Sequence, residues 1–379
     1  MSNVRPISLQ SCLGKLLNKL LAHRLGHIFA RHPILHPAQR GFVNGGTITK
    51  CIDELLDAWD WSRAGKHEQY TLLYDIRQAY DSVQVDVLQR ALLRLRMPAA
   101  FVSLVVDSLT GLSSCMRTAY GLSRTFAVER SLRQGDPLAP LLFVILMDAL
   151  HDGLECNPFT QQRHGLSMAL GNGVQMDLPS LGYADDTSAL TNTLADLRVQ
   201  NDWVQYFMAF NRIRLNHGKC ELIGRDAHGQ PVTAAALAAA GISIDGHALQ
   251  PVPHNQPIRY LGVHVSFDGS WAAQQRKAIE KTAMFQRAVV KFGVTIRQAV
   301  YMYNVFLMPM LELALHYMHG PGTAACIKQC DRLIIGSIKH AVSSPLMLSH
   351  TAVALSIGLL LPSWLETSVK TSELFLRMD

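Results

Sequence analysis

The stretch SLGYADDTSAL, residues 180–190, places two adjacent carboxylates, Asp185 and Asp186, inside an otherwise apolar run. Its other side chains favour burial, so the aspartate pair has no evident structural benefit there. Like charges that share a poorly solvated site repel each other, and another group must compensate them. The stretch predicts a strand, a tight turn and a second strand, with the aspartate pair at the turn.

A third carboxylate lies about 110 residues upstream. The apolar segment YTLLYDI, residues 70–76, predicts a buried strand that ends near Asp75. If this strand lies beside the Asp185–Asp186 hairpin in one sheet, the three carboxylates meet at one edge. Magnesium prefers hard oxygen ligands and keeps room for substrate phosphates. Two such ions can activate an attacking 3′-hydroxyl and stabilise a leaving pyrophosphate, and they would compensate the paired charges.

Hydrophobic periodicity around these segments indicates a mixed fold. Helices are predicted over residues 8–31, 48–62, 84–96, 99–111, 138–153, 194–213 and 234–240. A hairpin is predicted over residues 114–129, a loop and strand over 214–224, and a strand over 258–266. Beyond Trp271 the pattern is helical to the C-terminus. Strands confined to the middle of the chain predict an α+β protein with a helical tail.

The composition limits the class of protein. The chain has 379 residues, of which 49% are hydrophobic and 17% charged, enough for a sizeable core and two or three subdomains. No apolar run reaches the length of a membrane span, and the start lacks the apolar core of a signal peptide. The seven cysteines are scattered. We expect reduced thiols in an intracellular protein without a structural zinc site and without a membrane partner.

The charges are unevenly distributed although the net charge is only +6. No acidic residue precedes Asp53, whereas seven basic residues do: Arg5, Lys15, Lys19, Arg24, Arg31, Arg40 and Lys50. A second basic series comprises Arg276, Lys277, Lys281, Arg287, Lys291 and Arg297. Basic flanks around a middle with grouped aspartates suit a polyanion such as nucleic acid. Solvated helix faces are the alternative for any one of these cations.

Seven segments in the order of the family's motifs resemble those of reverse transcriptases. YADD (183–186), LYDIRQAYDSV (73–83) and LRQGDPLAPLLFVILMDAL (132–150) look like three of the family's motifs. Residues 5–25 and 35–49 are similar to the fingers of non-long-terminal-repeat retrotransposon enzymes. LNHGKCELIG (215–224) resembles the fourth palm motif, and IRYLGVHV (258–265) the segment before the thumb. The resemblance covers residues 3–270, with a weaker helical continuation to 345.

The resemblance implies a right-hand polymerase fold with an antiparallel palm sheet. Residues 1–70 would form partial fingers, and residues 71–265 a palm with interleaved finger helices. Residues 266–345 would form a helical thumb, and 346–379 a helical tail that is not assigned. The chain would be the polymerase core of a longer retroelement protein, since nothing in it resembles an endonuclease or an RNase H.

The resemblance also implies roles for individual residues. Asp75 and Asp185 would be metal ligands and catalytic residues, with Asp186 as the third carboxylate. The main-chain oxygen of Ile76 would reach the second metal ion. Tyr80 would crowd the sugar 2′ position and so favour deoxynucleotides by sterics.

Further residues match substrate contacts of the family. Gln134, Gly135 and Pro137 match the loop that packs on the incoming nucleotide and template. Lys219 resembles a lysine that protonates pyrophosphate. Arg5 and Arg40 are finger candidates for the triphosphate, because a guanidinium fits phosphate oxygens.

Each role has a structural alternative. Asp75 could cap a turn, and Tyr80 could be an aromatic residue of the core. Gln134 could serve loop hydrogen bonding, and Lys219 and Arg5 could be exposed surface charges.

The function implied is RNA-directed DNA polymerase activity. It would extend a primer 3′-hydroxyl with dNTPs by two-metal-ion nucleotidyl transfer, using two Mg²⁺ ions or Mn²⁺ as a substitute. The partners would be an RNA template and a DNA primer or nicked target DNA, and the compartment would be the nucleus. The sequence leaves the oligomeric state open.

Three other functions stay open. An RNA-dependent RNA polymerase has the same palm, and Asp81 favours it because such enzymes carry a second aspartate for a ribose hydroxyl. The bulk of Tyr80 argues against it. A catalytically dead retroelement relic or RNA-binding module is a second alternative. A group II intron-type reverse transcriptase or maturase is the third, although the wording of RPISL and QRGF leans away from it.

Overall fold

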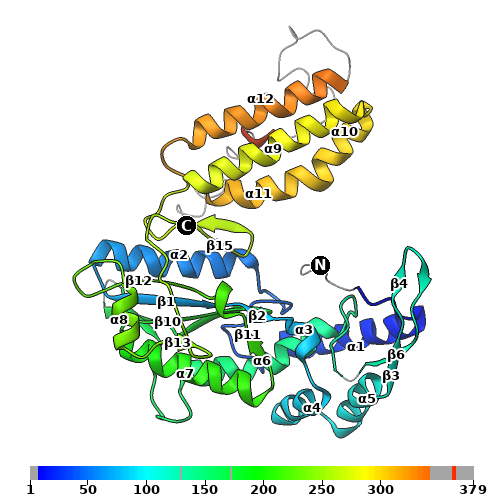
Figure 1. Ribbon diagram of the computed structural model, residues 1–379, viewed down its shortest axis with the longest axis vertical. Coiled ribbons are helices and arrows are strands. Elements are labelled where there is room, and N and C mark those ends of the chain that lie inside the picture. The colour runs from blue at the N-terminus through cyan, green and yellow to red at the C-terminus, as the bar shows by residue number, and fades with distance from the viewer. Residues whose placement is uncertain (1–6, 129, 171–172, 342–360, 364–379) are drawn as a thin grey trace. The chain divides into compact units, whose positions relative to one another are not determined.

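The computed structural model describes residues 7–128, 130–170, 173–341 and 361–363. The chain divides into two compact units, residues 1–254 and residues 255–379 (Figure 1). The predicted α+β class is confirmed, because the strands concentrate in the first unit and the second is helical after a short hairpin. The division falls within the range predicted for the palm, so residues 255–265 belong to the second unit.

A four-stranded antiparallel sheet forms the centre of the first unit. Its strands, in spatial order, are β12 (Glu221–Arg225), β1 (Gln69–Tyr74), β10 (Asp186–Thr191) and β9 (Ser180–Tyr183). The burial of β1 and β10 is nearly continuous instead of alternating, which is typical of strands covered on both faces. Helix α2 (Ile48–Gly65) lies on one side of the sheet, and α6 (Ala139–Glu155) and α7 (Leu194–Phe210) lie on the other (Figure 1).

Helix α6 is the central core helix of this unit. Thirteen of its seventeen side chains are buried, including the whole run from Leu141 to Asp148. A helix that is apolar on every side is stable only inside a protein, where other elements surround it. The sheet, α7 and α4 (Val85–Arg94) do so here. The sequence LLFVILM therefore marks the core and not a membrane span.

Smaller elements complete the first unit. The remaining helices are α1 (Cys12–Arg31), α3 (Ala79–Ser82), α5 (Ala99–Leu109), α8 (Ala234–Ala239) and the 3₁₀ turn η2 (His217–Lys219). Two-stranded pairs are formed by β2 (Ile76–Arg77) with β11 (Arg214–Leu215), β3 (Leu112–Ser114) with β6 (Phe126–Val128), β4 (Arg117–Thr118) with β5 (Gly121–Leu122), β7 (Leu166–Ala169) with β8 (Gln175–Leu178), and β13 (Ser243–Ile244) with β14 (His247–Ala248).

The apolar face of helix α1 is only partly covered. Seven leucines follow the helical period over residues 9–25, yet only Leu25 is buried, and Leu21 is half-buried against the core. Leu9, which precedes the helix, and Leu13 are each 81% exposed. The described part of the chain therefore leaves the leucines from Leu9 to Leu20 exposed. The helix also begins at Cys12 and not at residue 8, because Ser11 caps it through a hydrogen bond from the Gly14 N–H.

Two hairpins were also not predicted. Residues 258–266, predicted as one strand, form the hairpin of β15 (Ile258–Tyr260) and β16 (Val263–Val265), because Leu261 and Gly262 both take positive φ values. The β7–β8 hairpin precedes the aspartate hairpin and gave no signal in the sequence.

Helix α7 ends at Phe210 instead of residue 213, since Arg212 adopts the left-handed conformation that stops a helix.

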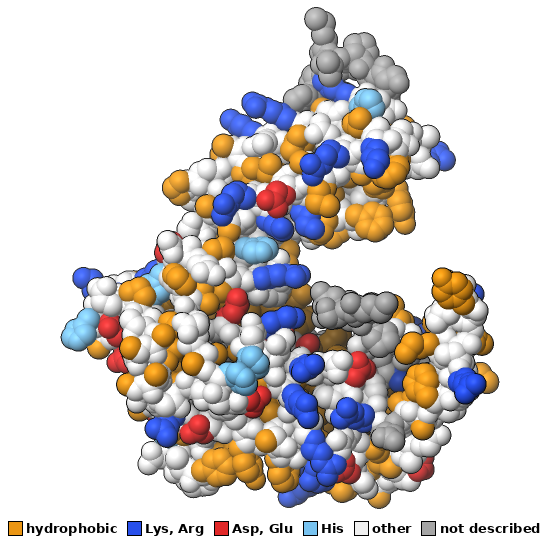
Figure 2. Space-filling view, in the orientation of Figure 1, with side chains coloured by type: hydrophobic (Ala, Val, Ile, Leu, Met, Phe, Trp, Pro, Cys, Tyr) orange, Lys and Arg blue, Asp and Glu red, His pale blue; other side chains and the backbone are white. Residues whose placement is uncertain are grey.

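The second unit begins with the β15–β16 hairpin, and a helical bundle follows it along the chain. Its helices are α9 (Ala272–Phe292), α10 (Ile296–Met302), α11 (Met308–Tyr317) and α12 (Thr323–Ala341), with a wide π-helical turn η3 (Tyr303–Leu307) between α10 and α11. Helices α9 and α12 pack along each other (Figure 1). On the visible face of this unit, Lys and Arg side chains outnumber Asp and Glu (Figure 2). Across both units, none of the described helices has the length and apolarity needed to span a bilayer.

Candidate active site

The strand register brings the three predicted carboxylates to one end of the sheet. Tyr74 of β1 pairs with Thr187 of β10, so the next residue of each strand toward that end is Asp75 and Asp186, respectively. Asp186 pairs in turn with Tyr183 of β9, which leaves Ala184 and Asp185 as a two-residue loop. Asp75 therefore lies beside the turn that carries the aspartate pair, although 110 residues separate them in the sequence.

The charges of the two adjacent aspartates affect the pKa values of different neighbours. The charge of Asp185 helps to raise the pKa of the Tyr80 hydroxyl, whereas the charge of Asp186 contributes to the raised pKa of the Cys51 thiol on α2. Burial is the larger cause in both cases. Asp185 belongs to the loop, whereas Asp186 is the first residue of β10. Asp185 is half-buried and Asp186 is exposed.

Asp75 is held by a residue that the sequence analysis did not single out. The Asn216 side chain donates from Nδ2 to Oδ2 of Asp75 at 2.9 Å, and the Asn216 backbone N–H donates to the Asp75 carbonyl at 2.8 Å. Within the described residues, Oδ1 of Asp75 accepts no hydrogen bond. The charge of Asp75 also helps burial to raise the pKa of Glu221 on β12. Asp75 is thus oriented through one oxygen and keeps the other available.

These carboxylates fit divalent metal ions by the chemistry of their donors. Hard oxygen ligands, a free Oδ1 on Asp75 and a neighbouring aspartate pair are what magnesium binding requires. Over the described ranges, no group of three or more His, Cys, Asp and Glu side chains is close enough to hold a metal ion by itself. Any metal would therefore be completed by substrate oxygens or water.

Tyr80 lies next to this site in a fixed orientation. Its ring stacks on Phe143 of α6, with centroids 5.1 Å apart and an interplanar angle of 16°. Its carbonyl accepts a hydrogen bond from the Leu132 N–H at 2.8 Å. Burial and the charge of Asp185 raise the pKa of the Tyr80 hydroxyl to about 12, so the phenol is neutral at physiological pH. The neighbouring Asp81 accepts from the Ser131 hydroxyl at 3.2 Å.

The predicted nucleotide loop is fixed by Asp136. Its Oδ2 accepts from Asn18 of α1 at 2.7 Å and from Gln10 at 3.0 Å, and its Oδ1 accepts from the Leu138 N–H at 2.9 Å. Gly135 has a φ of 96°, which favours glycine, and it is exposed. Gln134 and Pro137 are half-buried. Asp136 thus anchors this loop to the N-terminal segment and leaves Gly135 at the surface.

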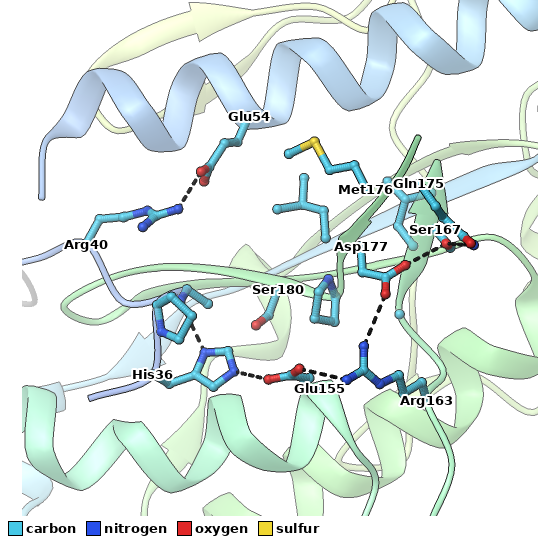
Figure 3. Close-up of a pocket in the computed structure, with 16 residues that line it drawn as sticks. His36, Arg40, Glu54, Glu155, Arg163, Ser167, Gln175, Met176, Asp177 and Ser180 are labelled. Carbon is cyan, nitrogen blue, oxygen red and sulfur yellow. Dashed lines mark hydrogen bonds and ion pairs between the residues drawn. The ribbon is translucent and has the colours of Figure 1, made fainter. Parts of the chain in front are cut away.

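The three predicted cations and the predicted main-chain ligand have different environments. Lys219 is exposed at the end of η2, three residues after the Asn216 that holds Asp75. Arg40 is ion-paired with Glu54 of α2, so its charge is already compensated (Figure 3). Ile76, the predicted main-chain ligand, is buried in β2. Arg5 lies outside the described residues.

A cavity of about 480 Å³ lies beside segment 36–41, between this segment and the β7–β8 hairpin. The Arg40–Glu54 pair lines it, together with a chain of contacts from His36 through Glu155 and Arg163 to Asp177 (Figure 3). Apart from Arg40, none of the predicted site residues lines it. Its charged groups pair with each other. Because Asp75, Asp185 and Asp186 do not line it, the cavity is separate from the carboxylate site.

Comparison with known proteins supports the motifs. Residues 1–265 match the family described as reverse transcriptase (RNA-dependent DNA polymerase). The chain belongs to this family. The match covers all seven resembling segments, and the prediction of a right-hand polymerase fold is thereby confirmed.

The chain is similar to retrotransposon proteins. It is 27% identical over 348 residues to a Pol polyprotein from the type-1 retrotransposable element R2 of Popillia japonica, a match that covers 90% of this chain and 45% of the relative. It is 25% identical over 349 residues to the polyprotein from element R2DM of Drosophila melanogaster, with 90% and 30% covered. The predicted non-long-terminal-repeat type is confirmed. The chain spans less than half the length of these relatives.

Solved structures with some similarity to this chain include telomerases. The telomerase from Candida tropicalis in complex with a fragment of telomeric RNA matches with a TM-score of 0.44 and 10% identity, over 92% of this chain and 56% of that chain. The corresponding structure from Candida albicans matches with a TM-score of 0.44 and 11% identity, over 92% and 59%.

Proposed function

We propose that this protein is an RNA-directed DNA polymerase that extends a primer 3′-hydroxyl with dNTPs on an RNA template. The observation that supports this most is the register of β1 and β10, which brings Asp75 beside the Asp185–Asp186 turn. Family membership supplies the reaction class. The substrates would be an RNA template and a DNA primer or nicked target DNA, and the site of action the nucleus.

The proposed assignment of parts follows the two units. The central sheet would be the palm, with partial fingers before residue 70 and interleaved finger helices between β1 and β9. The bundle after residue 265 would be the thumb. Bound divalent cations, Mg²⁺ or its substitute Mn²⁺, would lower the pKa of the attacking hydroxyl and stabilise the charge on the leaving pyrophosphate.

The residues of the chain would hold and orient the reactants. Asp75 and Asp185 would ligate the cations with the Ile76 carbonyl, and Asp186 would support the geometry. Asn216 orients Asp75 through Oδ2, which directs Oδ1 toward the ligand. The flat face of Tyr80, held against Phe143, would limit the space at the sugar 2′ position.

The loop and the cations would act on the nucleotide. Gln134, Gly135 and Pro137 would pack on the incoming base and template, and the exposed Lys219 would donate a proton to pyrophosphate. A triphosphate contact by Arg40 requires that Glu54 first release the guanidinium.

Primer extension on an RNA template tests the proposal. We expect the wild-type protein to extend a DNA primer with dNTPs in Mg²⁺ and Asp185→Asn to lose at least about a thousandfold in rate, because a metal ligand contributes several kcal/mol to the transition state. Both proteins should bind the primer–template. Ca²⁺ should support binding without synthesis, since its looser coordination suits in-line transfer poorly. Equal inactivity of wild type and variant, with RNA binding intact, would favour the RNA-binding module instead.

A further inference from the structure

Segment 38–41 runs along the outer edge of the hairpin that carries the aspartate pair. Gln39 forms a parallel bridge with Gly182 of β9. The Gly182 N–H donates to the Ala38 carbonyl at 3.0 Å, and the Arg40 N–H donates to the Gly182 carbonyl at 2.7 Å. The segment thus extends the sheet beyond β9. It pairs with Gly182, which lies two residues before Ala184 of the loop.

The side chain of Gln39 reaches from this segment to the loop itself. Its Oε1 accepts from the Ala184 N–H at 2.9 Å, and its Nε2 donates to the Ala184 carbonyl at 3.3 Å. The same Oε1 accepts from the Gly41 N–H at 3.0 Å. Gln39 is only 2% exposed, so these bonds form away from competing water. One amide therefore satisfies both backbone polar groups of the residue before Asp185.

Ala184 needs such support because its backbone is strained. Its φ is 57°, in the left-handed region where the Cβ of a non-glycine residue crowds the backbone. A conformation of this kind persists only where surrounding contacts determine it. If Ala184 relaxed to a negative φ, the peptide that leads into Asp185 would rotate and redirect that carboxylate.

The packing on both sides of the turn leaves little room for adjustment. A Cβ on Gly41 would lie 2.4 Å from the Ala184 nitrogen, so Gly41 allows the segment its close approach to the loop. A Cβ on Gly182 would lie 2.4 Å from Nε2 of the buried His151 on α6. The hairpin is therefore fixed between the segment and α6, and Gln39 supplies the hydrogen bonds at its tip.

We infer that Gln39 is a positioning residue for Asp185, which it fixes through the backbone of Ala184. This inference rests on the proposed polymerase function for its catalytic consequence. Glutamine suits the role because one side-chain amide both donates and accepts, matching the carbonyl and the N–H of a single residue. A glutamate carboxylate would accept both N–H bonds but would face the Ala184 carbonyl without a donor. Methionine has a similar length and makes neither bond.

The first test is hydrogen exchange, which does not depend on activity. In the wild-type protein, we expect the Ala184 amide in peptide 180–190 to be protected. In Gln39→Met, which offers no acceptor, it should exchange at least about tenfold faster. Gln200→Met is the matched control: Gln200 is equally buried on α7, where it donates to the Leu154 carbonyl at 3.2 Å. A wild-type Ala184 amide that exchanges freely would refute the inference even if every variant failed to fold.

The second test is kinetic. We expect Gln39→Met to lower kcat about 10- to 100-fold and to raise the Mg²⁺ concentration for half-maximal rate, with KM for primer–template unchanged. Gln200→Met should change neither quantity. If Gln39→Met keeps the wild-type kcat and Mg²⁺ requirement, or loses activity only in proportion to its unfolded fraction, Gln39 is merely structural. An inactive wild type with a protected Ala184 amide would instead refute the proposed function while the contact with Ala184 stands.

Discussion

Three features constrain Tyr80. Its ring is stacked on Phe143, and its main-chain carbonyl accepts a hydrogen bond from the Leu132 N–H. Burial and the charge of Asp185 raise the pKa of its hydroxyl to about 12, so the phenol is even further from ionisation at neutral pH than an ordinary tyrosine. A neutral, fixed ring can discriminate by shape without a charge that would repel phosphate. The stacked arrangement also gives the residue a packing role, so the two roles must be separated by experiment.

We expect Tyr80→Ala to relax the preference for dNTPs over rNTPs by at least about tenfold, because the space at the sugar 2′ position opens. Tyr80→Phe is the matched control, since it keeps the ring and removes only the hydroxyl. Single-nucleotide incorporation with each nucleotide type measures the effect. Equal use of dNTPs and rNTPs by the wild type would exclude Tyr80 as a gate, and a loss of discrimination in Tyr80→Phe would assign the effect to the hydroxyl.

His151 makes stability depend on pH. It is fully buried between α6 and β9, and burial, with a smaller effect of His36, lowers its pKa from 6.5 to about 3. The unfolded chain therefore takes up a proton below pH 6.5 that the folded protein does not. The stability from this residue is present above pH 6.5 and falls by about 1.4 kcal/mol per unit as the pH decreases toward 3.

Denaturant unfolding at pH 7 and pH 5 measures this linkage. We expect the wild type to lose about 2 kcal/mol more than His151→Gln over that interval, because the variant has no proton to bind there. His164, which pairs with Asp196 at 2.8 Å and is partly exposed, is the control histidine. An unchanged pH slope in His151→Gln would contradict the prediction.

At the residue scale, the sequence identified the carboxylates but not what holds them. Asp185 and Asp186 break an apolar run and Asp75 ends a buried strand, so each leaves a local signal. Gln39 and Asn216 leave none, because a lone amide in a polar loop is ordinary. Their contacts span 145 and 141 residues, and no short-range pattern encodes such a distance.

At the scale of elements, the connection of α6 to its neighbours depends on one buried charge. Asp148 is 1% exposed, accepts from the His36 N–H at 2.6 Å and is ion-paired with Arg94 of α4. Burial raises its pKa, while the His36 N–H and Arg94 act in the opposite direction. The pair thus joins α4, α6 and the segment that continues to Gln39.

We expect Arg94→Met to lower the free energy of unfolding by about 3 kcal/mol, because it leaves Asp148 buried without its cation. The double variant Arg94→Met/Asp148→Asn should recover part of this loss, since the uncompensated charge is removed. Arg90→Met, which breaks an exposed pair with Asp86 and a cation–π contact with the exposed Phe210, should change stability by no more than about 1 kcal/mol. Equal effects of Arg94→Met and Arg90→Met in denaturant unfolding would show that the burial of Asp148 does not matter.

Periodicity predicted most elements because their packing is local. Helices α2, α4, α5 and α6 and strand β1 begin and end within a few residues of the predicted positions. Helix α1 shows the limit: its leucine period predicts a buried face, but whether a face is covered depends on other segments. The β7–β8 hairpin and the turn at Leu261 were also not predicted, since short strands and left-handed non-glycine residues leave little signal in the sequence.

At the scale of the whole molecule, three basic residues of the second unit share one face of a helix. Arg276, Arg287 and Lys291 lie within about 60° of one another around α9 at 100° per residue, and all three are exposed. Their spacing over four turns follows a line of phosphates better than a single ligand. Lys281 lies on a different face and is partly buried.

We expect each of Arg276→Gln, Arg287→Gln and Lys291→Gln to weaken primer–template binding and to reduce the slope of log K against log salt by about 1. Lys281→Gln should leave the slope unchanged. Fluorescence anisotropy over a range of KCl concentrations measures both. Wild-type slopes in all three variants would exclude this face of α9 from nucleic-acid binding.

The long-range contacts at the carboxylates have a consequence for biosynthesis. Gln39, Asp75, Ala184 and Asn216 come from four separate parts of the chain and meet at one end of one sheet. A ribosome must therefore release the chain through Asn216 before the last of them can dock. High contact order slows such assembly, so we expect the carboxylate site to form late, after the helices that surround it.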